Sequence, residues 1–451
     1  MSQVKVYGRD PRTAGPIFKR QVIDPPSVSK LMAKLTTSQG ISTLCRYGLD
    51  RETGATSHEA LRCVANAMLL NEPSRQIFVD LGYATKAAER LKLGNIDDEF
   101  LLCRILFLLT YNTNIDFVPL VNEHALAQSL NERTAHHSTA FSESGRRGSR
   151  ASPIEDMAMV EALKLIFNIT HFYPDLIPTF TPSLKSLVNI LLHHDLPTPP
   201  LQSPITYILN ALLNLDLNTA QMTRAESKVE NSPLFPDQHP EGVIDRLTSI
   251  LFKAVKEHPE SELDEAALPL CTLLRRVYEV ASPEMKARTR ELLLPDDQDR
   301  EQPLGKGETL SARLLKLSCS PHLPSLGENI SSLLFELSDK DPNKFVENIG
   351  YGFAAGFLSS HNIDVPASAT GEGSGGRDNI SGRGDINPIT GQRWSAENKQ
   401  KPNLPEMTEE EKEREAERLF VLFERLRATG VVDVKNPVQQ AVDEGRFEEL
   451  D

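Results

Sequence analysis

The sequence predicts an all-α fold, an armadillo- or HEAT-like helical-repeat superhelix (solenoid) that continues into a linker and a C-terminal helical tail. Apolar residues recur at helical spacing in blocks of roughly 12 to 18 residues. Strand signals are nearly absent, because few stretches alternate with period 2 and the Asn-Gly and Asp-Gly hairpin pairs do not occur. Prolines lie between the blocks, where they start or stop helices, at Pro73, Pro119, Pro174, Pro259, Pro283, Pro324 and Pro342.

The helical blocks also resemble one another. Residues 59–66 and 161–168 share the order Glu-Ala-Leu-basic-x-x-x-Asn, residues 205–214 give a third version, and residues 100–110 give a fourth that lacks the Asn. Units of about 40 residues are typical of armadillo and HEAT repeats, in which each unit buries its apolar surface only by stacking on its neighbours. We therefore expect about eight repeats within residues 26–363, after an N-terminal segment at 1–25.

Two polar stretches interrupt the helical pattern. Residues 132–153 contain almost no large apolar side chain, which predicts a disordered insertion. Residues 364–404 are rich in Gly and Ser, which predicts a flexible linker.

A helical tail is expected at residues 405–451. Thr408 and Glu411 have the spacing of a capping box, and a helix from Thr408 to Ala428 would carry Phe420 and Phe423 on one apolar stripe. These two rings would contact a partner or pack on the repeats as part of the core, and the pattern does not decide between the two.

Composition narrows the function. The 451 residues carry 49 basic and 63 acidic side chains, for a net charge of −14, which disfavours a nucleic-acid binder. No apolar signal segment or membrane span is expected, and five cysteines without a CxxC pair suggest reduced, buried thiols. These features predict a cytoplasmic protein.

Candidate catalytic and metal-binding residues are few. Gly371, Gly373 and Gly375 come near a phosphate-loop spelling, but no strand precedes them and no helix follows. The pairs 136–137 and 193–194 are adjacent histidines, which point to different faces of a helix, and no Cys or carboxylate cluster accompanies them. We expect no metal, no cofactor and no enzymatic chemistry.

The repeated Asn predicts a binding surface. In stacked repeats the third helix of each unit lines the inner groove, where an amide offers donors and an acceptor to a bound peptide. The candidate partner-binding residues are Asn66, Arg104, Asn168, Asn210 and Asn214. For each single Asn, a bond to the backbone between repeats is an equal alternative.

One modification site is a candidate within the polar insertion. Two arginines precede Ser149 in the order Arg146-Arg147-Gly148-Ser149, which matches what a basophilic kinase recognises by charge. A solubilising basic patch is the alternative.

Several of these blocks, taken in order, resemble the synembryns, which are exchange factors and chaperones for heterotrimeric G-protein α subunits. Residues 59–63, 104–110 and 161–170 are similar to the family's repeat core, and residues 350–358 to the end of its helical array. The most specific stretches are Ile386-Asn-Pro-Ile-Thr-Gly391 and Met407-Thr-Glu-Glu-Glu-Lys-Glu-Arg-Glu-Ala416, which resemble its C-terminal signature. Animal members carry an acidic, kinase-modified stretch before the first of these, whereas this chain is Gly/Ser-rich there.

The resemblance implies a function without a catalytic residue. A concave groove would capture the C-terminal helix of a GDP-bound α subunit, and the helix at 408–428 would reach its nucleotide-binding lobe. Release of GDP then follows from tighter binding to the empty state than to the filled one. The family also implies a chaperone role and recruitment to the cell cortex or plasma membrane through its partner. We expect a monomer that binds no nucleic acid and does not insert into a membrane. The alternative is an armadillo-type peptide-binding scaffold or adaptor without exchange activity.

Overall fold

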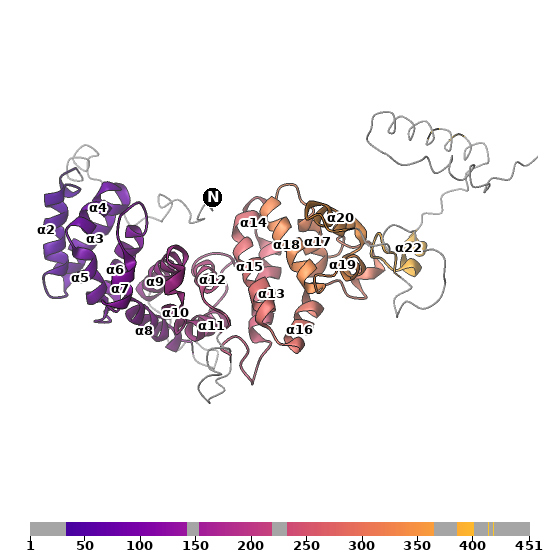
Figure 1. The fold of residues 1–451 in the computed structure, drawn as a ribbon, viewed down its shortest axis with the longest axis horizontal. Coiled ribbons are helices and arrows are strands. Elements are labelled where there is room, and N and C mark those ends of the chain that lie inside the picture. Colours follow the sequence, from indigo (N-terminus) through magenta and orange to yellow (C-terminus); the bar gives the residue numbers. More distant parts are fainter. Residues whose placement is uncertain are drawn as a thin grey trace, which may run out of the picture. The chain divides into compact units, whose positions relative to one another are not determined.

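The computed structural model describes residues 33–141, 153–218, 232–364 and 386–400, together with Arg414 and Arg418 (Figure 1). Within these ranges the regular structure is helical, and the one extended pairing is an antiparallel bridge between Ile386 and Arg393. No helix in the described part of the chain is long and apolar enough to cross a membrane. The chain divides into two units, Met1–Arg393 and Trp394–Asp451.

The first half of the larger unit contains short helices joined by tight turns. They are α2 (Ser38–Leu49), α3 (Ala55–Leu70), α4 (Pro73–Asp80), α5 (Tyr83–Leu91), α6 (Ile96–Leu109), α7 (Phe117–Asn122), α8 (Leu126–Thr139), α9 (Pro153–Phe172), the 3-10 turn η2 (Pro174–Leu176), α10 (Ile177–Phe180), α11 (Ser183–His193) and α12 (Ile205–Asn214).

The second half continues in the same style. It contains α13 (Gly242–Glu257), α14 (Glu260–Ala266), α15 (Leu268–Val280), α16 (Pro283–Leu293), the 3-10 turn η5 (Asp299–Glu301), α17 (Leu310–Ser318), α18 (Pro324–Leu337), α19 (Pro342–Ile349) and α20 (Tyr351–Ser360), whereas α22 (Trp394–Gln400) belongs to the second unit.

Local sequence explains where several of these helices begin. The Asn95 side chain accepts hydrogen bonds from the Asp97 and Asp98 backbone at 2.9 and 3.1 Å, which caps α6. Ser282 and Asp341 cap α16 and α19 in the same way, each followed by a proline in the first turn. The prolines between blocks therefore mark helix starts, as the sequence indicates.

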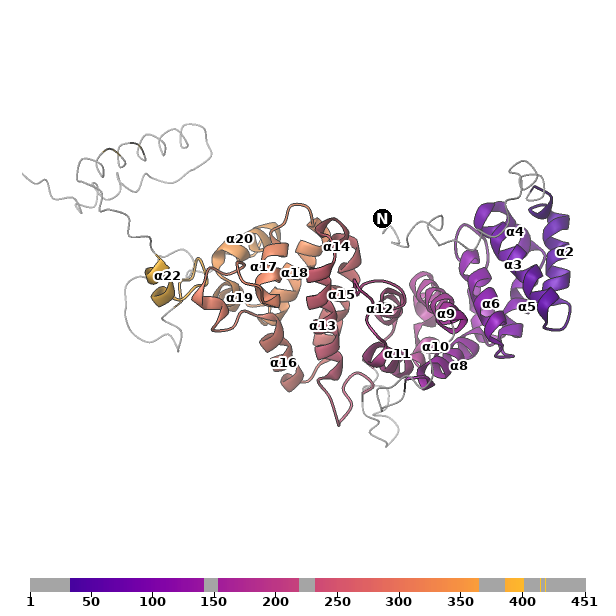
Figure 2. The same cartoon turned by 180° about the vertical axis from the view of Figure 1, so that it is seen from behind.

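Every third helix belongs to one continuous row. We call α3, α6, α9, α12, α15 and α18 the ladder helices, because each packs on the next (Figures 1 and 2). One apolar core runs through the larger unit from Ile41 to Leu358. The prediction of an all-α helical-repeat solenoid is confirmed, and stacking of units that cannot bury their apolar surface alone explains it.

Arginine side chains join the repeats where helices end. The last carbonyl groups of a helix have no partner within it, and an arginine guanidinium supplies donors to them as well as a charge that suits the negative helix end. The contacts run from Arg75 to Met68, Arg90 to Gly48, Arg246 to Leu191 and His194, Arg276 to Leu213 and Leu215, Arg290 to Leu337, and Arg300 to Asn348. We call these the arginine caps.

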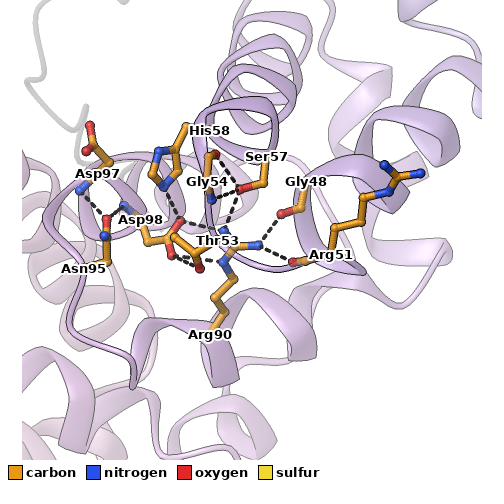
Figure 3. Close-up of polar contacts among 10 residues, drawn as sticks. All are labelled: Gly48, Arg51, Thr53, Gly54, Ser57, His58, Arg90, Asn95, Asp97 and Asp98. Carbon is orange, nitrogen blue, oxygen red and sulfur yellow. Dashed lines mark hydrogen bonds and ion pairs between the residues drawn. The ribbon is translucent and has the colours of Figure 1, made fainter.

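The arginine cap made by Arg90 belongs to a buried ion network (Figure 3). Arg90 donates to both carboxylate oxygens of Asp98 at 3.0 Å, to the Ser57 hydroxyl at 3.0 Å and to the Gly48 carbonyl. The His58 ring nitrogen Nε2 lies 3.2 Å from Asp98. Arg90 and Asp98 are buried, so the pair is largely shielded from water and ties the start of α3 and α6 to α5.

We expect Arg90→Met to lower the stability of helices α2 to α6 by about 3 kcal/mol or more, because Asp98 keeps a buried charge without its partner. Amide hydrogen exchange of these helices measures the loss. Arg288→Met is the matched control, since Arg288 makes exposed ion pairs with Asp245 and Glu291 and should change stability by less than about 1 kcal/mol. Equal effects of the two substitutions would contradict a structural role for the buried network.

Two predicted boundaries are wrong. Residues 132–139, expected in the disordered insertion, continue α8, because Arg133 and His137 bind the buried Glu99 of α6 at 2.6 and 2.7 Å. Residues 386–393, expected in the flexible linker, are ordered against the end of the larger unit. Residues 142–152 of the insertion lie outside the described residues, as do most of the remaining linker and nearly all of the tail.

The Glu99 carboxylate links acid stability to α8. Burial raises its pKa, but the hydrogen bond from His137 and the charges of His137 and Arg133 outweigh burial and hold the pKa of Glu99 below its ordinary value. A carboxyl whose pKa is lower in the folded state stabilises the fold above its unfolded pKa of about 4.3, and this contribution is lost as pH falls through the folded value.

We therefore expect Glu99→Gln to reduce stability at neutral pH and to flatten the loss of stability on acidification. The measurement is the thermal unfolding midpoint of both proteins between about pH 3 and pH 7, a window that spans the ordinary carboxyl pKa. Glu291→Gln, which alters an exposed carboxyl paired with Arg288, should keep the parent's pH profile. A Glu99→Gln variant that loses stability with acid as steeply as the parent would refute the assignment.

Candidate functional site

The five residues that the sequence predicts for the groove lie on four successive ladder helices. Asn66 lies on α3, Arg104 on α6, Asn168 on α9, and Asn210 and Asn214 on α12. Because these helices pack in a row, the structure brings the predicted positions onto one series of neighbouring elements.

Two of the predicted amides hold the repeats together. Asn168 is 1% exposed, and its Nδ2 donates to the Thr110 hydroxyl at 2.7 Å. Asn214 donates to the Phe167 carbonyl at 3.0 Å, which joins α12 to α9. Both amides therefore bond across helices, Asn214 to a backbone carbonyl as in the alternative and Asn168 to a side-chain hydroxyl, and Asn168 has almost no surface to offer a partner.

The other two amides remain available. Asn66 and Asn210 are half-buried, and neither side chain makes a hydrogen bond to another described residue. A half-buried amide with spare donors and an acceptor is suited to bind the polar groups of a docked peptide. Phe420, Phe423 and Ser149 lie outside the described residues, so their predicted roles stay predictions.

Arg104 is held by a shared carboxylate. Its Nη1 lies 3.4 Å from Glu161 Oε1, while the other oxygen of Glu161 lies 2.6 Å from Lys164 Nζ. One buried carboxylate thus faces two cations, Arg104 from α6 and Lys164 from α9.

Lys164 is the central residue that sequence reasoning did not single out. Its ammonium nitrogen lies 4.7 Å from the centroid of the Phe107 ring on α6 and 5.9 Å from that of Tyr207 on α12. Burial lowers its pKa, and the charge of Glu161 opposes that shift. The available signal was the basic position of the repeated Glu-Ala-Leu-basic motif, which Lys164 occupies.

Aromatic side chains continue this group. Phe107 and Tyr111 make an edge contact at 5.3 Å, and Tyr111 reaches Phe172 of α9 at 6.4 Å. His171 stacks on Phe167 at 5.8 Å. We call the whole set the cation–aromatic cluster, and its members are Arg104, Phe107, Tyr111, Glu161, Lys164, Phe167, His171, Phe172 and Tyr207.

The cluster retains surface for a partner. Phe172 is 45% exposed, although its ring touches two aromatic neighbours, Tyr111 and His171. A recess of about 220 Å³ lies beside Glu161, lined by Phe100, Met157, Val160 and Pro204 together with the polar residues Asp156 and Ser203. Aromatic rings and an Arg are enriched among the residues that carry most of the binding energy in protein interfaces.

These observations define an all-α repeat protein whose ladder helices present cations and aromatic rings. A family model described as guanine nucleotide exchange factor synembryn matches residues 27–446, so the chain belongs to the synembryn family.

Individual relatives are similar over different spans. A synembryn-like chaperone of Schizosaccharomyces pombe is 38% identical over 34% of this chain, a match that spans 30% of that relative. Chaperone Ric-8A of Bos taurus is 26% identical over 83% of this chain and 72% of its own length. Chaperone Ric-8A of Xenopus tropicalis is 24% identical over 93% of this chain and 82% of its own length.

Proposed function

We propose that this chain is a guanine nucleotide exchange factor and folding chaperone for heterotrimeric G-protein α subunits. Its ladder helices bind the helix that ends the α subunit, and the bound state retains an α subunit without nucleotide. Family membership supports the activity, and the cation–aromatic cluster on three successive ladder helices is the observation that supports the binding surface.

Charge complementarity favours a helix that ends a chain as the occupant. The C-terminus of a helix carries a partial negative charge, and a terminal carboxylate adds a full one. Arg104 and Lys164 share the carboxylate of Glu161, and a second carboxylate, Asp156, lines the recess beside it. The apolar side of the same helix would cover Phe172 and its aromatic neighbours, and Asn66 and Asn210 would bind polar groups at the flanks.

Exchange then needs no catalytic side chain. The factor accelerates GDP release when it binds the empty α subunit better than the filled one, and reversal of a 1:99 population requires about 5.5 kcal/mol of differential affinity. The C-terminal tail would supply part of this energy through a second contact with the α subunit. The same grip on a partly folded α subunit would shield its exposed surface and so act as a chaperone.

We expect Lys164→Met and Phe172→Ser each to weaken binding of a peptide with the C-terminal sequence of an α subunit about tenfold or more, because each removes a central contact. Titration calorimetry with this terminal peptide measures the affinity. The matched controls are Lys253→Met and Phe252→Ser, which alter exposed side chains of α13 outside the row of ladder helices. Unchanged affinity in both Lys164→Met and Phe172→Ser would exclude the cluster as the binding surface.

An adaptor without exchange activity is distinguished by GDP release. We expect the protein to accelerate the loss of labelled GDP from a purified α subunit. A chain that ends after Pro405 should bind the terminal peptide normally but accelerate this loss less. Binding without release by the full chain would favour the adaptor. A fall in the thermal midpoint of the truncated chain would instead assign Phe420 and Phe423 to packing on the repeats.

A further inference from the structure

The end of the repeat array is closed by a segment that returns from the predicted linker. We call residues 386–393 the clasp. The backbone N–H groups of Tyr351 and Gly352, at the start of α20, donate to the Pro388 and Ile389 carbonyls at 2.8 and 2.9 Å. The first N–H groups of a helix have no partner within it, so the clasp acts as the missing N-terminal cap of α20.

Arg300 joins the clasp to the repeats. It is 2% exposed, and its guanidinium donates to the Gly391 carbonyl of the clasp and to the Asn348 carbonyl at the end of α19, both at 2.8 Å. Its own carbonyl accepts from the Arg393 backbone N–H at 3.0 Å. A single buried residue therefore connects the last turn of α19 with both ends of the Gly391–Arg393 stretch.

Further contacts fix the same position. The Arg393 side chain forms ion pairs with Asp297 at 2.8 Å and Glu301 at 3.3 Å. Gly391 has φ +69°, and a Cβ there would collide with the Leu304 side chain, so the clasp needs glycine at this close approach. Separate main-chain, buried-cation and surface-charge contacts hold the clasp in place.

We propose that Arg300 is a positioning residue for the C-terminal tail, an inference that rests on the proposed function. Because the clasp fixes Arg393, Thr408 lies 15 positions beyond the last fixed residue, whereas in a chain free from Asp364 onward it would lie 44 positions beyond. For a flexible tether the effective concentration of the tethered site falls roughly as the −3/2 power of the tether length, so 15 positions in place of 44 correspond to an increase of at most about fivefold. Seven of the 15 positions form the helix α22.

The sequence offers a direct reporter of clasp release. Trp394 is the only tryptophan of the chain, and it follows Arg393 immediately. In Arg300→Met we expect a lower fluorescence anisotropy of Trp394 and GDP release slowed up to about fivefold, the tether estimate. Affinity for the terminal peptide of the α subunit should stay unchanged. Arg288→Met, on α16, should leave all three measurements at the parent's values.

A second variant opens the clasp from its own side and keeps the buried arginine. The Asn387 side chain accepts from the Ile389 backbone N–H at 2.9 Å, which shapes the clasp turn. Asn387→Ala should lower Trp394 anisotropy and GDP release as Arg300→Met does, and it decides the question if the Arg300 variant fails to fold.

Two results would overturn the proposal: a Trp394 anisotropy that stays at the parent's value in every folded variant, or a lowered anisotropy with GDP release at the parent's rate. The second result would leave the clasp as a helix cap alone. Failure of the parent protein to bind the peptide or release GDP would instead overturn the proposed function.

Discussion

Stacked short helices create many helix ends, and the arginine caps supply hydrogen bonds to the unpaired carbonyl groups at these ends. Each end leaves carbonyl groups without partners, and in a stack several of them lie where water has little access. Arg246 and Arg276 each bind two such carbonyls of an earlier helix. Their burial lowers the pKa of both guanidinium groups, which reflects the cost of placing them there. The repeats are thus joined by charge as well as by apolar packing.

The sequence predicts the fold but only part of the site. Helical periodicity and the prolines reveal the repeat units, because both are local signals. Whether an Asn side chain is bonded to another helix or remains available to a partner is not determined by the local sequence. Asn66 and Asn168 occupy the same place in the repeated motif, yet Asn168 meets Thr110 of another helix while Asn66 keeps its surface. Only the rotation and spacing of neighbouring helices separate these outcomes.

Polar composition misleads for a related reason. Glu99 and Arg133 are 34 positions apart, and Arg300 and Gly391 are 91 apart, so neither partner is visible in the local stretch whose composition predicts disorder. A polar segment becomes ordered when distant groups satisfy its charges and backbone. The role of Lys164 is hidden in the same way, because Phe107 and Tyr207 reach it from other helices.

The row of ladder helices has a consequence for damaged molecules. Each ladder helix packs on the next, and stability in such arrays is roughly a sum of nearest-neighbour terms. Melting or proteolytic clipping near α19 and α20 would therefore spare α3 to α9. Under the proposed function, such a molecule would still bind an α subunit without accelerating GDP release, and would compete with intact copies as a dominant inhibitor.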